Sequence, residues 1–160
     1  MAQEGMENGK KVMIAIDENE CSLYALRWAL DNLQDRLTTS SLVIFTAQPM
    51  ADYGYIYAAS LGSAHPQLTK AIQEHQKKVS LSLLEKAKDI CANQGVTAET
   101  ITEIGDPKEA ICNAVEKFKI NLLILGCRSR GVLQRAFLGS VSNYCVHHAK
   151  CPVLVVKKQE

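Results

Sequence analysis

The sequence predicts an α/β fold in which a doubly wound, five-stranded parallel sheet has helices on both faces. Short apolar runs typical of buried strands alternate with longer segments whose apolar residues recur at helical spacing. Strand and helix patterns follow one another from the first strand to the fifth, which favours parallel pairing. No internal repeat or linker divides the 160 residues, so we expect a single domain.

Each expected strand has its own pattern. The strands are expected at residues 11–17, 41–47, 96–104, 121–125 and 152–156. The first is almost wholly apolar, as a strand covered on both faces should be. In the third, Val96, Ala98 and two threonines alternate with polar residues, which predicts a half-exposed strand near a sheet edge.

The expected helices lie between these strands. They are predicted at residues 23–33, 67–93, 107–118 and 140–149. Gly95 suits the end of the second helix. Asp106 and Pro107 suit the N-cap and first turn of the third. The segment between the second strand and second helix carries Tyr53, Tyr55 and Tyr57, and a loop of this length is either functional or a disordered excursion.

The overall composition excludes several classes of protein. A hydrophobic content of 47% is enough for a packed core, and a net charge of +1 argues against general binding to nucleic acid. No apolar run is long enough to span a membrane, so no membrane partner is expected. The first ten residues lack the apolar stretch of a signal peptide. We therefore expect residues 1–10 to form a disordered tail and the protein to be cytoplasmic.

The six cysteines are expected to be free thiols, because no signal peptide and no CxxC pair is present. Cys127 stands out because it follows Gly126 in what reads as a basic loop, beside Arg128. Neighbouring cations favour the reactive thiolate, so a redox role is one interpretation. The other is a small residue that happens to be cysteine.

The most informative segment runs from Gly126 to Ser142. It contains, in order, the end of an apolar strand, a basic loop with glycines, and Gly139-Ser140 at the start of a helical pattern. Glycines allow backbone N–H groups to approach an anion closely, and the free N–H groups of a helix start point at it. This order predicts a phosphate site, and hence nucleotide binding.

Polar side chains of the same segment have two interpretations each. Ser140 and Ser142 are candidates to hydrogen-bond a phosphate, and Ser140 is also a candidate cap of the helix, two roles that can hold together. Arg128, Arg130 and Arg135 either screen phosphate charge or form a solvated basic surface.

Asp17 ends the first strand. If the first and fourth strands are neighbours, Asp17 and Gly126 face one crevice at the carboxyl ends of the strands, where open α/β sheets bind ligands. The carboxylate suits a ribose hydroxyl or a Mg²⁺ ion beside phosphates, and the alternative is a cap on the following helix.

Signs of catalysis are few. The sequence contains neither a Walker A motif nor a GxGxxG fingerprint. No Ser–His or Cys–His pairing is indicated, and we name no catalytic residue. His147 and His148 are adjacent on a helix and point in different directions, so they do not suggest a metal site.

Six segments together resemble one family. They are Val12–Asp17, Ser22–Leu30, Gly105–Pro107, Asn121–Gly126, Arg135–Ser142 and Cys151–Val156. In these segments the chain resembles the universal stress protein (UspA-like) family, and within it the plant single-domain type. The resemblance implies a Rossmann-like adenine-nucleotide-binding fold with strand order 3-2-1-4-5, in a domain spanning residues 11–158.

The resemblance also implies a ligand site. ATP-binding members carry a Gly-x2-Gly-x9-Gly-Ser/Thr motif, and Gly126, Gly139 and Ser140 match it, whereas Ser129 occupies the second glycine position. The implied ligand is ATP or AMP, with Mg²⁺ accompanying ATP and Asp17 as the candidate residue that contacts the ion. The implied site residues are Ala15, Ile16, Asp17, Ala47, Leu125, Gly126, Arg128, Ser129, Gly139, Ser140, Val141 and Ser142.

Two further implications concern assembly and function. The family is typically dimeric through its last strand, here Pro152–Val156, and an exposed apolar edge strand needs such cover. The expected function is an adenine-nucleotide-binding regulatory protein of the stress response, with at most slow ATP hydrolysis. The alternatives are a nucleotide-independent dimeric scaffold or chaperone-like protein, and an adenine-nucleotide hydrolase in which Asp17 arranges Mg²⁺.

Overall fold

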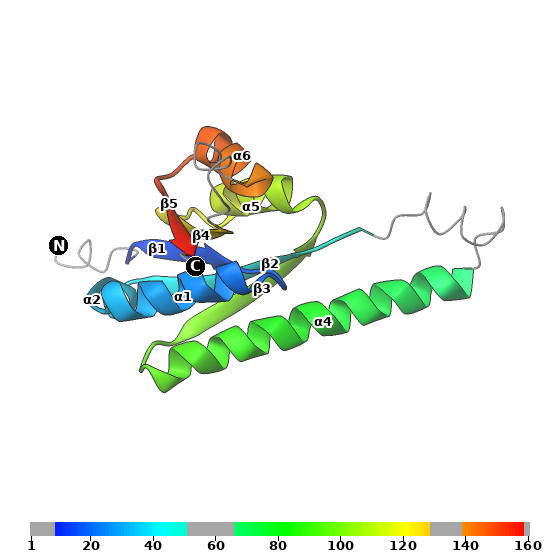
Figure 1. Cartoon of the computed structure of the whole chain (residues 1–160), viewed down its shortest axis with the longest axis horizontal. Coiled ribbons are helices and arrows are strands. Elements are labelled where there is room, and N and C mark those ends of the chain that lie inside the picture. The colour runs from blue at the N-terminus through cyan, green and yellow to red at the C-terminus, as the bar shows by residue number, and fades with distance from the viewer. Residues whose placement is uncertain (1–8, 51–65, 129–138, 159–160) are drawn as a thin grey trace, which may run out of the picture.

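The computed structural model describes residues 9–50, 66–128 and 139–158. They form a five-stranded parallel sheet in the order β3-β2-β1-β4-β5, which confirms the predicted fold class and strand order (Figure 1). The strands are β1 (Lys11–Ala15), β2 (Ser41–Gln48), β3 (Ala98–Ile104), β4 (Leu122–Arg128) and β5 (Val153–Lys158). Because every pair is parallel, the carboxyl ends of all five strands lie at one edge of the sheet.

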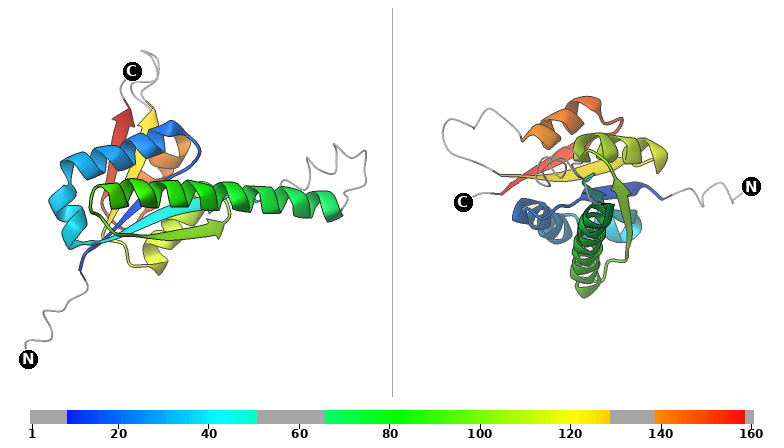
Figure 2. Two further views of the ribbon diagram at one scale, coloured as in Figure 1. Left: turned by 90° about the horizontal axis from the view of Figure 1, so that it is seen from below. Right: turned by 90° about the vertical axis from the view of Figure 1, so that its right-hand side faces the viewer.

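Helices cover both faces of this sheet. They are α1 (Glu20–Asn32), α2 (Gln34–Thr39), α4 (Pro66–Asn93), α5 (Pro107–Lys117) and α6 (Ser140–His148). The helices α1 and α4 lie on one face and α5 and α6 on the other (Figure 2). Within the described part of the chain, no helix combines the length and apolarity needed to cross a membrane.

The core has two layers, one on each side of the sheet. Neighbouring residues of a strand point to opposite faces, so Val12 and Ile14 of β1 pack against α1 and α4, whereas Met13 packs against α5. All three side chains are fully buried. Burying a side chain of this size stabilises a fold by about 1.5–3 kcal/mol, which is why β1 contains so few polar residues.

The short helix α2 was not predicted. Its sequence, QDRLTT, has a single apolar residue, Leu37, which is buried against the first core layer. Six residues with one apolar position give no periodicity to detect. The helix forms where the chain turns back from α1 toward β2, and its first turn begins with the Leu37 N–H donating to the Leu33 carbonyl.

The predicted end of the fourth strand was wrong. β4 does not stop at Leu125 but continues through Gly126 and Cys127 to Arg128, and these last three residues pair with β5. β5 correspondingly runs past Val156 to Lys158. Parallel pairing satisfies the backbone groups of both segments, so a polar sequence that reads as a loop becomes strand once a partner lies beside it.

The exposed character of the third strand was predicted correctly. β3 pairs only with β2 and forms one edge of the sheet. It begins at Ala98 rather than Val96, although Val96 is itself buried just before the strand. The last residue, Ile104, is 68% exposed.

The cysteines form no disulfide in the described residues, which include all six positions. Cys127 is in β4 and only 7% exposed, so the expectation that it lies in a basic loop was wrong. Burial in a strand reduces the access that a redox-sensing thiol needs, and the redox role of Cys127 stays a prediction. The buried Cys145 of α6 lies with its sulfur 3.9 Å from that of Cys112 on α5, which brings two thiols together where these helices pack.

We expect these buried thiols to make the fold sensitive to alkali. Burial raises the pKa of Cys145 to about 12, with a further increase from Cys112, and raises that of Cys91 to about 11. Between the ordinary thiol value and these values, the unfolded chain has lost protons that the folded chain retains. The contribution of these thiols to the unfolding free energy is therefore fully present below about pH 9, and it is lost as pH rises toward 12.

The measurement is urea unfolding of the wild-type protein and Cys145→Ala between about pH 8 and pH 11. The variant should lose less unfolding free energy across this range than the wild-type protein. Groups that titrate in the same range, other than the neighbouring Cys112 and Cys151, affect both proteins equally. Parallel losses in the two proteins would contradict the assignment.

Candidate functional site

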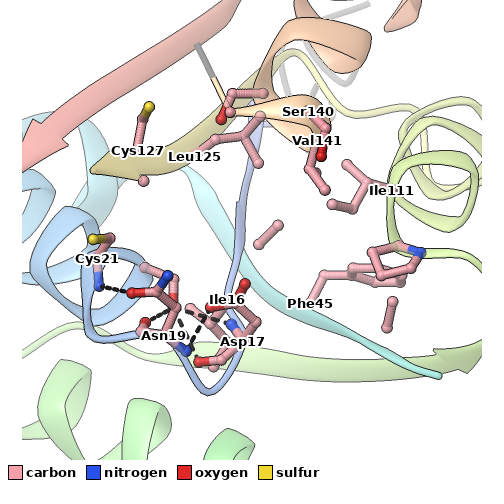
Figure 3. Close-up of a pocket in the computed structure, with 17 residues that line it drawn as sticks. Ile16, Asp17, Asn19, Cys21, Phe45, Ile111, Leu125, Cys127, Ser140 and Val141 are labelled. Atoms are coloured by element: carbon pink, nitrogen blue, oxygen red, sulfur yellow. Dashed lines mark hydrogen bonds between the residues drawn. The ribbon is translucent and has the colours of Figure 1, made fainter. Parts of the chain in front are cut away.

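A cavity of about 590 Å³ opens at the carboxyl ends of the central strands (Figure 3). It holds ten of the twelve site residues predicted from the sequence. These are Ala15, Ile16, Asp17, Ala47, Leu125, Gly126, Gly139, Ser140, Val141 and Ser142. A volume between about 300 and 1,000 Å³ is usual for a pocket that binds a small molecule.

The other predicted residues fall outside this description. Arg128 ends β4 through its main chain, while its side chain is not described. Ser129, Arg130 and Arg135 lie outside the described residues, as does the segment with Tyr53, Tyr55 and Tyr57. Their predicted roles remain predictions.

The cavity forms because β1 and β4 are neighbours, the condition set out from the sequence. Ile14 lies beside Ile124 in the parallel ladder. The chain then leaves β1 at Ile16, whose N–H still donates to the Phe45 carbonyl at 2.8 Å. Asp17 and Gly126 consequently line the same cavity.

The turn from β1 into α1 is held by side-chain hydrogen bonds (Figure 3). Asn19 is the N-cap of α1, since its Oδ1 accepts from the Cys21 N–H at 3.1 Å. The Asp17 Oδ1 accepts from the Asn19 N–H at 2.9 Å, and the Asp17 N–H donates to the Ser22 Oγ at 3.0 Å. The helix-capping alternative for Asp17 was therefore wrong, because Asn19 performs that task.

The Asp17 carboxylate remains open to a ligand. Its side chain is exposed at the cavity, and the one hydrogen bond described for it uses Oδ1. A carboxylate has about four acceptor positions. The remaining positions can accept from hydroxyl groups or bind a cation.

The start of α6 supplies the opposite wall. Gly139 is its N-cap and provides no side-chain hydrogen bond, so the expectation that Ser140 caps the helix was wrong. The Asn143 N–H donates to the Gly139 carbonyl at 2.8 Å, as the first turn of a helix requires. The N–H groups of Ser140, Val141 and Ser142 come before this bond and have no partner within the helix.

These N–H groups make the α6 end of the cavity suitable for an anion. They combine with the positive end of the helix dipole. Ser142 is 4% exposed and Ser140 is exposed, so their hydroxyls are presented at different depths of the same wall. In contrast, α1 and α5 begin with side-chain caps, Asn19 and Asp106.

The two glycines that line the cavity have different reasons for being glycine. A Cβ at Gly126 would lie 2.6 Å from the Cys21 carbonyl carbon and 2.9 Å from the Ser22 Cα. Only glycine lets α1 approach β4 so closely. A Cβ at Gly139 would meet nothing within 4 Å, and its φ of −58° suits any residue, so packing within the described protein does not require glycine there.

Several lining residues were missed by the sequence analysis. They are Asn19, Cys21, Ser22, Phe45, Pro107, Ile111 and Cys127. Phe45 was within reach, because it shares a strand face with Ala47 at a spacing of two. Pro107 and Ile111 come from α5. The packing of α5 against β2 depends on the whole fold, so no pattern in the sequence near these residues indicates that they line the cavity.

The arrangement defines an α/β protein of the Rossmann-like type, with its cavity at the strand edge where such folds bind ligands. Comparison with known proteins identifies the family. The chain belongs to the universal stress protein family, whose model matches residues 9–157.

Individual relatives agree with this assignment. The chain is 30% identical over 158 residues to a universal stress protein A-like protein of Arabidopsis thaliana, covering 92% of this chain and 90% of the relative. The crystal structure of a universal stress protein family protein from Arabidopsis thaliana with AMP bound is 27% identical, with a TM-score of 0.67 and coverage of 94% and 92% of the two chains. UspA from Lactobacillus plantarum, at 18% identity and a TM-score of 0.70, has the same fold over 94% of this chain and 99% of its own.

The steric difference between the two glycines predicts different effects on stability. Gly126→Ala forces α1 away from β4 and should lower the unfolding free energy by about 1–3 kcal/mol. Gly139→Ala, the matched control, should lower it by only about 0.5 kcal/mol, because alanine is a poorer N-cap than glycine. Denaturant unfolding of both variants measures this. Equal stabilities would mean that the close contact of β4 with α1 is not tight in solution.

Proposed function

We propose that the protein binds an adenine nucleotide, AMP or ATP, in the cavity between β1, β4 and α6, and acts as a regulatory binding protein. The observation that carries the proposal is the uncapped start of α6 facing the Asp17 carboxylate across one cavity. One wall suits an anion and the other suits hydroxyl groups. A nucleotide has both, joined through its ribose.

The lining residues suggest an orientation for the ligand. Phosphates would lie at the N–H groups of residues 140–142, and the ribose hydroxyls would reach Asp17. The base would then lie on the apolar surface of Phe45 and Ala47 with Pro107. The relative with AMP bound supports the choice of adenine, because it shares 27% of its sequence and nearly the whole length with this chain.

Mg²⁺ would enter with the triphosphate rather than alone. The described residues contain no group of three or more metal-binding side chains. Magnesium is commonly held by one or two carboxylates together with substrate phosphates. The exposed Asp17 carboxylate fits that role, so we propose that it contacts the ion when ATP is bound.

The same lining supports binding over turnover. Asp17 is the one carboxylate among the described lining residues, and no histidine accompanies it. A general base within hydrogen-bond reach of an attacking water is usually worth 10²–10⁴-fold in rate, as a rough scale. We propose a regulatory protein of the stress response, with at most slow ATP hydrolysis.

Finer properties of the protein belong to the same proposal. We propose one domain over residues 11–158, of the plant single-domain type, located in the cytoplasm. A nucleotide-independent scaffold is the function that would follow if the cavity binds no nucleotide, since Ser129 occupies a glycine position of the family motif.

Calorimetric titration with AMP and with Mg²⁺–ATP tests the binding proposal. The wild-type protein should bind, and Gly139→Val should weaken binding by tenfold or more, about 1.4 kcal/mol, because the new side chain occupies the space of the phosphates. Stability should fall by no more than about 1 kcal/mol, the usual cost of a poor N-cap, since a Cβ at this position meets no atom of the described residues. Absence of heat at millimolar nucleotide would reject the proposal in favour of the scaffold.

We also propose that the protein is a homodimer joined through its last strand. β5 forms the second edge of the sheet, and its residues Val153, Leu154 and Val155 are half-buried in the single chain. The predicted strand, Pro152–Val156, is displaced relative to the observed one, Val153–Lys158. An edge of this kind leaves unpaired backbone groups and apolar side chains that a second copy can cover.

Light scattering after size exclusion tests the dimer. We expect a mass twice the 17.6 kDa of one chain. Replacing Val155 with lysine places a charge on the proposed interface and should shift the population toward the monomer. The same replacement at Ile104, on the opposite edge, should have no effect on mass. A monomeric wild-type protein at high concentration would reject the proposal.

A further inference from the structure

A second cavity, of about 350 Å³, lies beside the nucleotide cavity. The two share four lining residues, Asp17, Asn19, Ala47 and Pro107. The second cavity extends from this shared wall toward α4, where Val79 and Leu83 line it together with Ser80. A ligand in the first cavity would therefore have a second, separate space within reach of one end.

The orientation of the nucleotide decides which end that is. The start of α6 contributes nothing to the second cavity, and Figure 3 shows Ser140 and Val141 across the first cavity from Asp17 and Asn19 of the shared wall. Phosphates at α6 would therefore lie away from the shared wall. With the phosphates at α6 and the ribose at Asp17, the base is the group nearest Ala47 and Pro107. The part of adenine farthest from the ribose is the six-membered ring, which carries the exocyclic amine. A group attached to that amine would point into the second cavity.

The lining of the second cavity shows what kind of group fits. Val79, Leu83, Pro49 and Ala47 give it apolar walls, and such surface favours an alkyl or aromatic group. Glu18 and Asp17 are the acidic residues at its rim. These carboxylates would repel a second phosphate or another anion, although His75 also lines the cavity. The apolar walls favour an uncharged group over a cation.

One polar atom on α4 is consistent with an amine at this place. Gln76 lines the second cavity, and its Oε1 is buried without a hydrogen-bond partner among the described residues. A buried acceptor left unpaired costs about 1–3 kcal/mol. An exocyclic amine that carries one substituent retains one N–H, which can donate to such an acceptor.

We propose that the preferred ligand is an adenine nucleotide with an apolar substituent on the exocyclic amine of the base, and that the second cavity receives this substituent. The proposal rests on the proposed function, because the phosphates and ribose must first occupy the first cavity. It goes beyond it by naming the class of nucleotide that the site distinguishes.

The test compares three nucleotides by calorimetric titration of the full-length protein. They are AMP, AMP with one benzyl group on the exocyclic amine (benzyl-AMP), and AMP with two methyl groups there (dimethyl-AMP). Benzyl-AMP should bind about tenfold more tightly than AMP, since its ring leaves water for an apolar space. Dimethyl-AMP lacks the N–H and should gain less than threefold.

Two variants with the same new side chain locate the effect. Val79→Trp fills the second cavity and should reduce the ratio of the AMP to benzyl-AMP dissociation constants from about ten to about one. Leu81→Trp, on the same helix but 47% exposed and outside both cavities, should keep the ratio at about ten. Thermal unfolding checks that both variants fold, and the wild-type comparison stands without them.

Each outcome decides between the two proposals. If AMP binds and benzyl-AMP binds no better, the substituent proposal is overturned while the proposed function stands. If the ratio is unchanged in Val79→Trp, the preference arises elsewhere and the second cavity is not its cause. If neither nucleotide binds, both proposals fail.

Discussion

The cavity depends on one close contact, between the first turn of α1 and the end of β4. At Gly126 the backbone of β4 lies against Cys21 and Ser22 with no room for a side chain. That contact holds the turn containing Asp17 beside the end of β4. Without it, α1 would move outward, and the carboxylate and the start of α6 would no longer face one cavity. Backbone packing therefore determines where the Asp17 turn lies relative to the start of α6, independently of the side chains in the site.

Ser22 links this contact to the Asp17 turn. It is 6% exposed, and its Oγ lies 2.9 Å from the Asn19 carbonyl and 3.1 Å from the Asp17 carbonyl. Both carbonyls compete for one hydroxyl proton, while the Oγ accepts from the Asp17 N–H. A residue that reads as the start of an amphipathic helix therefore also fixes the backbone on which the proposed ribose-binding carboxylate stands. The burial of Ser22 between α1 and β4 therefore also positions the Asp17 turn in the site.

The sequence predicted the fold and most of the cavity because both follow from patterns along the chain. Alternating apolar runs and helical periodicity define the sheet, and parallel strands bring residues such as Asp17 and Gly126 to one edge without further information. The features that the sequence did not predict depend on contacts with residues distant along the chain. The end of β4 became strand only because β5 lies beside it. The Pro107 wall belongs to a helix whose position depends on the sheet beneath it.

The role of each glycine was also hidden from the sequence, since a motif records that a glycine is present and not why. Gly126 was interpreted as a place where a phosphate approaches, yet the structure gives it a steric reason within the protein itself. Gly139 has no such reason among the described residues, because a Cβ there would meet none of their atoms within 4 Å, beside an α6 N-terminus without a side-chain cap. A glycine that packing among the described residues does not require, at the mouth of a cavity lined by N–H groups without a partner in their helix, is best explained by a group that the protein must leave room for. Of the two, Gly139 therefore supports the proposal of ligand binding, and Gly126 supports the shape of the cavity in which that ligand would lie.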